Sequence, residues 1–93
     1  MTALKARFDL VPPRGLEQVA LLLAAAAEKH GERGWEQDAS RDVRGEIAAA
    51  LRHVFRWLAG TTIDPEYGYS HLVHAAARLL IAVELLTVNK REI

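Results

Sequence analysis

Residues 71–88 limit the fold of this chain more than any other segment, because their apolar side chains occupy almost every side of a helix. The large ones are Leu72, Val73, Leu79, Leu80, Ile81, Val83, Leu85, Leu86 and Val88. Burying one such side chain gains roughly 1.5–3 kcal/mol, whereas a chain of 93 residues buries only somewhat over ~60% of its unfolded surface. We therefore expect a second copy to cover part of this helix, in a homodimer or a dimer of dimers.

The composition favours helices over sheets, and the length allows a single domain. Apolar residues make up 51% of the chain and aromatic residues only 6%, with few β-branched side chains. We expect an all-α fold, in which a three-helix subunit completes a helical bundle by oligomerisation. Residues 1–14 are predicted to form an extended N-terminal arm, and residues 15–93 one all-α domain.

The charge balance and the lack of cysteine exclude several classes of function. Twelve basic residues cancel twelve acidic ones, so the chain has no general positive surface for DNA, RNA or an anionic membrane. Without cysteine there is no disulfide, thiolate metal site or cysteine nucleophile. The longest apolar run, Val19–Ala27, is short of the roughly 20 residues of a membrane span, and Arg78 and Glu84 interrupt the last apolar segment. We expect a cytoplasmic chain with no membrane partner.

Turn and capping residues divide the chain into three predicted helices. The first is expected over residues 16–30, after Pro12-Pro13 and before Gly31. Its apolar face consists of Leu16, Val19, Leu23, Ala26 and Ala27. The segment 31–40 is predicted to be a loop, and Trp35 within it is expected to pack back onto the domain.

The second helix is predicted over residues 41–59, capped by Asp38 or Ser40 and ended by Gly60. Its core stripe is expected to be Ile47, Leu51, Val54 and Leu58, with Glu46, Ala50, His53 and Trp57 about 100° around the helix and Arg52 and Arg56 pointing away. A turn-rich loop over 60–69 leads to Ser70, which is expected to cap the third helix over 71–88.

Histidines and acids gather around that loop. They are His53, Asp64, Glu66, His71 and His74, and Arg78 lies one turn beyond His74. Two chemistries suit this arrangement. The start of the third helix, with Arg78 and the histidines, suits a phosphate; alternatively His71 and His74, with His53 or Asp64, suit a divalent metal. Solvated turn acids and structural histidines are the simpler reading of the same residues.

The same residues resemble a known family at fixed spacing. The looser block is Arg7-x-Asp9-Leu10-Val11-Pro12-Pro13, Val19-Ala20 and Ala27-Glu28-Lys29-His30-Gly31-x-x-x-Trp35. The more specific block is Ala50-Leu51-Arg52-His53, Gly60 and Asp64-x-Glu66-x-Gly68-x-x-His71-x-x-His74-Ala75. Over roughly residues 7–86 the chain resembles the dATP/dGTP diphosphohydrolase N-terminal domain family. That family is frequent in bacteriophages and similar to the all-α, MazG-like nucleoside triphosphate pyrophosphohydrolases.

The resemblance implies a metal-dependent hydrolase that releases pyrophosphate from a purine deoxynucleoside triphosphate, in the host cytoplasm if the chain is phage-encoded. It implies that Asp64 and Glu66 hold Mg²⁺ or Mn²⁺ and act in catalysis with His53. His71 and His74 would contact phosphate or metal, and Lys29 and Arg52 would neutralise charge. Trp35 would stack on the base. Glu28 and Glu46 are more distant metal-ligand candidates.

Departures from the family pattern leave a second function open. Where the family pattern has acids just after Gly60, this chain has Thr61 and Thr62. Where the pattern has tyrosine, asparagine, serine and asparagine, the chain has His30, Gly34, Tyr67 and Arg78. The paired acidic motifs of the wider pyrophosphohydrolases are missing. Loss of acids and gain of Arg78 favour direct phosphate binding, as in a phage-type protein that sequesters a nucleotide signal of host defence. A helical interaction module with structural histidines is the third alternative.

Overall fold

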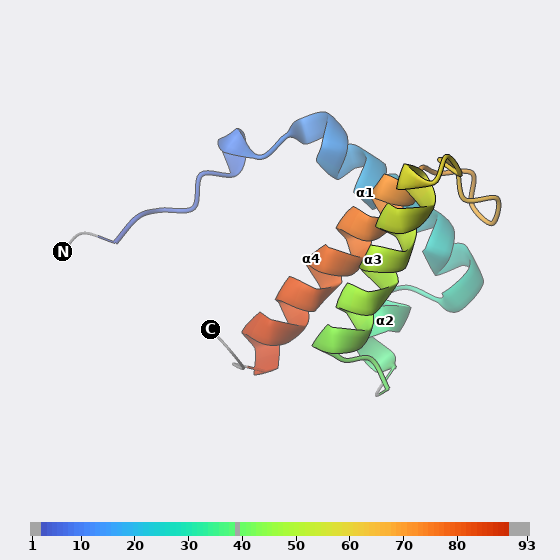
Figure 1. Ribbon diagram of the computed structural model, residues 1–93. Helices are drawn as coiled ribbons and strands as arrows, with labels where there is room; N and C mark the ends of the chain where they lie inside the picture. Colours follow the sequence, from blue (N-terminus) through green and yellow to red (C-terminus); the bar gives the residue numbers. More distant parts are fainter. Residues whose placement is uncertain (1–2, 39, 90–93) are drawn as a thin grey trace.

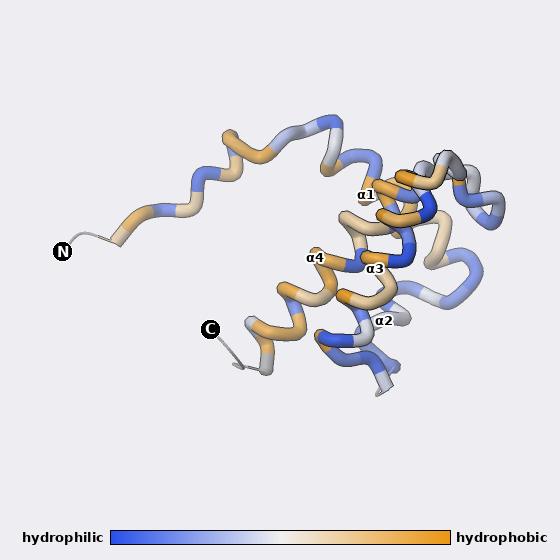
Figure 2. The backbone as a smooth tube through the Cα atoms, viewed as in Figure 1, coloured by the Kyte–Doolittle hydropathy of each residue, from blue (hydrophilic) through white to orange (hydrophobic). Residues whose placement is uncertain are grey.

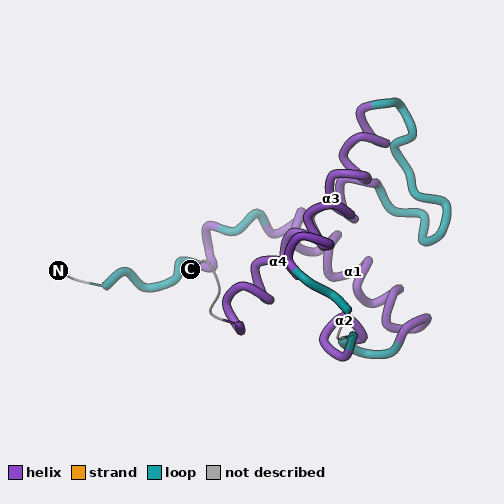
Figure 3. Tube along the Cα trace, turned by 60° about the horizontal axis from the view of Figure 1, so that its bottom comes forward, coloured by secondary structure: helices purple, strands orange, loops and turns teal. Residues whose placement is uncertain are grey.

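The computed structural model describes residues 3–38 and 40–89. Within them the chain is helical, with a single turn of 3₁₀-helix η1 (Phe8–Leu10) followed by α1 (Pro13–His30), α2 (Gly34–Gln37), α3 (Val43–Leu58) and α4 (His71–Asn89) (Figures 1 and 3). The described residues contain no β-strand, only one isolated bridge between Ile63 and Ser70. The all-α prediction is confirmed, with three long helices and one short helix that the sequence did not predict.

The N-terminal arm ends slightly earlier than predicted, because α1 begins at Pro13 rather than at Leu16. A proline is tolerated in the first turn of a helix, where its missing N–H has no intrahelical partner. The described arm, residues 3–12, is exposed and extends away from the helices (Figure 1). Gly31 ends α1 as predicted: it has a φ of 87°, and its N–H donates to the carbonyl of Ala27.

The segment after α1 is more ordered than the predicted loop. The short helix α2 lies within it and carries Trp35, which is partly buried. The predicted caps of the next helix are wrong. Asp38 Oδ1 instead accepts the N–H and hydroxyl of Ser40, and Asp42 caps α3 by accepting the N–H of Gly45 at 2.7 Å.

The connection from α3 to α4 is a tight hairpin-like loop. The N–H of Asp64 donates to the carbonyl of Tyr69, and the N–H of His71 donates to that of Thr62, both at 2.8 Å. The hydroxyl of Ser70 accepts the N–H of Leu72, so this predicted cap is confirmed. These bonds fix Asp64 beside the first turn of α4.

α3 and α4 run antiparallel and form the main contact of the fold, and α1 packs on another side of α4 (Figure 1). Most of the buried apolar residues among the described ones are alanines, which lets the helices approach closely: Ala49, Ala50, Ala75, Ala77 and Ala82, together with the larger Val19, Leu22 and Ile81. Trp57 is partly exposed, and Arg52 and Arg56 lie on the exposed side of α3, as predicted.

The predicted core stripe of α3 is wrong for the single chain. Glu46, Ala50 and His53 are buried against the neighbouring helices, whereas Ile47 and Leu51 are 40% and 50% exposed. Leu58 is also exposed, and Val54 is half-buried. Likewise α1 buries Val19 and Leu22, and the predicted Leu16 is exposed. Glu46 and His53 can occupy the inner face of α3 because residues on other segments form hydrogen bonds with their side chains.

Large apolar side chains therefore remain on the surface of α3 and α4. Figure 2 shows that hydrophobic residues recur along both helices. They are Ile47, Leu51, Phe55 and Leu58 on α3, and Leu72, Leu79, Leu80 and Val83 on α4. By length and composition alone, residues 71–88 of α4 would suffice to cross a membrane, with a mean hydropathy of 1.6 and a third of the segment buried. Core helices of soluble proteins share this property, so the sequence-based expectation of no membrane partner stays a prediction.

Candidate functional site

A cavity of about 740 Å³ lies between α1, the α2 segment, the α3–α4 loop and α4. Its polar lining from the predicted site comprises Trp35, His53, Asp64, Glu66, His74 and Arg78. Its apolar wall comes mainly from α1 and α4, through residues such as Leu22, Ala26 and Ile81. A cavity of this size and mixed lining suits a small organic ligand.

Three histidines meet at the cavity wall, and two of them, His53 and His74, line the cavity. The Nδ1 atoms of His53 and His71 lie 2.8 Å apart, and the His53 and His74 rings stack with their centroids 4.5 Å apart. His71 is 2% exposed and does not line the cavity, so it supports His53 from behind. The spacing of His71 and His74 at i and i+3 placed both on one side of α4, but only folding brought His53 to them.

Asp64 faces this cluster from the α3–α4 loop. Its Oδ1 accepts the N–H of Glu66 at 2.7 Å, while Oδ2 lies 3.8 Å from Nε2 of His74 and 4.0 Å from Nδ1 of His71. Nε2 of His74 is buried and has no hydrogen-bond partner within the described residues. An unsatisfied buried ring nitrogen beside a carboxylate is a reason to consider a ligand there.

His53, Asp64 and His74 could together hold a divalent metal ion. Each offers one ligand atom, and these atoms lie within 4.8 Å of one another. Ligands bound to a common ion at about 2.1 Å lie about 3–4 Å apart, so small side-chain movements would complete the site. Two imidazoles and one carboxylate suit ions such as Mn²⁺, Fe²⁺ or Zn²⁺. The sequence predicted a set of His71 and His74 with His53 or Asp64; within the described residues the structure groups His74 with both His53 and Asp64 and leaves out His71.

The protonation of the histidines fits this chemistry. Burial, together with the neighbouring His74 and His71, lowers the pKa of His53 from 6.5 to about 4, although Asp64 acts in the opposite direction. Burial also lowers the pKa of His74, again against the effect of Asp64. Both rings are therefore neutral at pH 7. A neutral imidazole is the form that binds a metal.

Glu66 lines the same cavity but pairs with Lys29. Its Oε1 accepts a hydrogen bond from Nζ of Lys29 at 3.0 Å, and both side chains are about half exposed. This contact lowers the pKa of Glu66 and raises that of Lys29. The structure thus brings Asp64 and Glu66 to one loop, but it groups Asp64 rather than Glu66 with the other metal-ligand atoms of the described residues.

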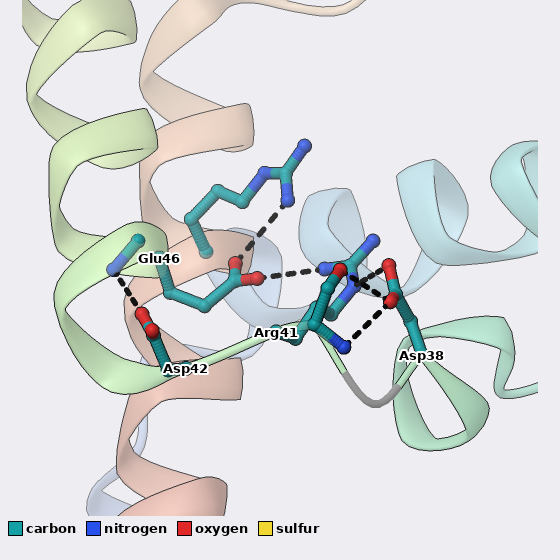
Figure 4. Close-up of polar contacts among 7 residues, drawn as sticks. Asp38, Arg41, Asp42 and Glu46 are labelled. Atoms are coloured by element: carbon teal, nitrogen blue, oxygen red, sulfur yellow. Dashed lines mark hydrogen bonds and ion pairs between the residues drawn. The ribbon is translucent and has the colours of Figure 1, made fainter.

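Beside the cavity, Glu46 is buried between two arginines that line it, Arg41 and Arg78 (Figure 4). Its Oε1 accepts from Nη1 of Arg41 at 2.9 Å, and its Oε2 accepts from Nη1 of Arg78 at 3.2 Å. Arg78 is among the ligand-binding residues predicted from the sequence, whereas Arg41 is not. The position of Arg41 just before α3 gave no signal of its own, because Glu46 was not expected to face inward.

The remaining predicted residues differ in their placement. Trp35 lines the cavity, but the guanidinium of Arg33 lies 5.1 Å from its ring centroid and covers part of the ring. Arg52 is exposed on α3 and does not line the cavity. Thr61 and Thr62, which replace the expected acids, are also exposed and lie outside the lining.

Comparison with known proteins agrees with the resemblance seen in the sequence. The family described as dATP/dGTP diphosphohydrolase, N-terminal, matches residues 1–92. A protein of Salmonella phage PMBT28 called dATP/dGTP diphosphohydrolase is 33% identical over 82 residues, which cover 88% of this chain and 27% of that protein. The chain thus spans about a quarter of the length of this curated relative. No solved structure matches. The chain belongs to the dATP/dGTP diphosphohydrolase N-terminal family.

Proposed function

We propose that this domain binds a purine deoxynucleoside triphosphate in the cavity and hydrolyses it to the monophosphate and pyrophosphate. One observation carries the proposal: in a member of this family, His53, Asp64 and His74 converge on one cavity with their ligand atoms within 4.8 Å of one another. When bound, a divalent cation would supply Lewis-acid stabilisation of the phosphoryl oxygens and lower the pKa of a bound water.

The residues around the proposed cation fit separate roles. The neutral rings of His53 and His74 and the carboxylate of Asp64 provide the ligand set, while His71 orients His53. Because Mg²⁺ prefers oxygen ligands, two imidazoles favour Mn²⁺ as the activating ion. Trp35 offers an aromatic face to the base, and Arg78 offers positive charge to the phosphates.

The test is a turnover assay on the purified chain. It is incubated with dATP or dGTP and Mn²⁺ or Mg²⁺, and the products are separated by ion exchange. We expect monophosphate and pyrophosphate in equal amounts, and loss of both with Asp64→Asn. Asp9→Asn is the matched control, since Asp9 lies in the exposed arm paired with Arg7. Absence of turnover with every nucleotide and metal would refute the catalytic proposal.

The pair of arginines at Glu46 favours a second candidate, a protein that binds a nucleotide and keeps it. Arg41 and Arg78 both line the cavity, and positive charge there holds phosphate without any metal. This candidate predicts metal-independent binding and recovery of the ligand intact after denaturation. Recovery of cleaved products, or loss of binding in EDTA, would contradict it.

For the assembly, we propose that a second copy covers the exposed apolar residues of α3 and α4. These two helices are antiparallel neighbours, so a two-fold axis beside them would generate a four-helix arrangement. Both helices offer large exposed apolar side chains, so the same surface of a second copy can pack against them. Burial of these side chains supplies the driving force.

A further inference from the structure

Glu46 and its two arginines form a charged cluster in which the carboxylate leaves most of the guanidinium N–H donors without a bond to it. Glu46 is 3% exposed, and each of its carboxylate oxygens accepts one guanidinium N–H. A guanidinium has five N–H donors in a fixed fork, so most donors of Arg41 and Arg78 remain uncommitted to Glu46. Both side chains line the cavity.

The orientation of Arg41 points to a missing acceptor. Its Nε is buried and has no hydrogen-bond partner within the described residues. The nearby acid, Asp38, has Oδ2 at 3.8 Å from this Nε, beyond hydrogen-bond distance, and its Oδ1 already accepts from Ser40. An orphaned guanidinium N–H at a cavity wall is best satisfied by an anion with several acceptor oxygens.

We propose that Arg41 and Arg78, held in place by Glu46, form a subsite for a diphosphate group. In this assignment Glu46 is a positioning residue, because it orients both forks without touching the ligand. Arg78 lies one turn of α4 beyond His74, a rise of about 6 Å. A polyphosphate chain can therefore extend from the metal-holding residues to the arginines. The diphosphate is the β,γ portion of the nucleotide, which rests on the proposed function; binding of free pyrophosphate does not.

The experiment measures binding of inorganic pyrophosphate to the whole chain by titration calorimetry in EDTA. We expect saturable binding without metal, weakened about ten-fold or more by Arg41→Gln or Arg78→Gln, since hydrogen bonds to charged groups are strong. Arg56→Gln, on the exposed side of α3, is the matched control and should leave binding unchanged. No binding at millimolar pyrophosphate, or equal affinities in all these variants, would overturn the subsite.

Two further variants keep the test decisive if removal of an arginine unfolds the chain around Glu46. Arg78→Lys keeps a cation for Glu46 but loses the planar guanidinium. It should weaken pyrophosphate binding, while a cooperative thermal unfolding transition shows that the variant is folded. Asp38→Asn keeps the Ser40 contact and removes a negative charge near Arg41, so it should tighten binding. Failure of both expectations would refute the subsite.

The subsite and the proposed function can fail separately. Pyrophosphate binding without any turnover of dATP or dGTP would support the subsite and refute the hydrolase. Turnover whose KM is unaffected by Arg41→Gln and Arg78→Gln would support the hydrolase and refute the subsite.

Discussion

Nδ1 of His53 lies 2.8 Å from Nδ1 of His71, so one of these nitrogens must donate and the other accept. When His53 donates, its Nε2 is left unprotonated and available to a metal, while His71 is fixed as the acceptor. His71 is 18 residues from His53 and almost completely buried, so it can hold the ring in one orientation. The proposed metal-holding group therefore depends on a residue that would not contact the metal.

Metal affinity should depend on Asp64 and His74 but not on Glu66. We expect Asp64→Asn and His74→Gln each to weaken Mn²⁺ binding strongly, because each removes one of three ligand atoms. Glu66→Gln should bind Mn²⁺ almost as the wild type does, because Glu66 pairs with Lys29. Calorimetry with Mn²⁺ measures all three. A large loss with Glu66→Gln would favour the ligand pair predicted from the sequence.

The metal-free domain should lose stability as the pH falls from about 6.5 to about 4. The unfolded chain takes up a proton on His53 near pH 6.5, whereas the folded chain resists protonation until about pH 4. Between these values the unfolded state binds more protons, so the free energy of unfolding falls as the pH falls. The lowered pKa of His74 acts in the same direction.

Urea unfolding in EDTA across this pH range measures the effect. His53→Gln should show a smaller decrease than the wild type, because glutamine does not titrate. Carboxylates that titrate in the same range are present in both proteins. Identical pH dependence in the two proteins would mean that His53 is not held neutral by the fold.

The N-terminus of α3 should be stabilised by Asp42. Its side chain accepts the N–H of Gly45, so Asp42→Ala should reduce the free energy of unfolding by about 1 kcal/mol. Ser40→Ala should cost less, since the Ser40 hydroxyl, in an exposed turn, bonds to Asp38 and caps no helix within the described residues. Denaturant unfolding at pH 7 compares the variants. A larger cost for Ser40→Ala would restore the cap inferred from the sequence.

Self-association should depend on the exposed apolar residues of α3 and α4. We expect Leu51→Glu and Leu80→Glu to produce monomers that remain helical, because both side chains are about half exposed in the single chain. Arg56→Glu should leave the assembly intact. Light scattering and circular dichroism at micromolar concentration report the two properties. A wild-type chain that is a stable 10.3 kDa monomer would refute the association.

The sequence by itself determined where the long helices lie. Pro12-Pro13 and Gly31 bound the first, Gly60 follows the second, and Ser70 caps the last. These signals act locally: a proline fixes its own φ, a glycine adopts positive φ without strain, and a serine hydroxyl reaches the next turn. Local chemistry is therefore sufficient to place them.

Tertiary structure decided which face of α3 is buried. Periodicity identified the apolar stripe through Ile47 and Leu51 but could not show that the chain itself leaves this stripe exposed. Glu46 can occupy the inner face because Arg78, 32 residues away, neutralises it together with Arg41. His53 can do so because His71 shares a hydrogen bond with it. The free energy of burying a polar group depends on such distant partners, and only the packed fold supplies them.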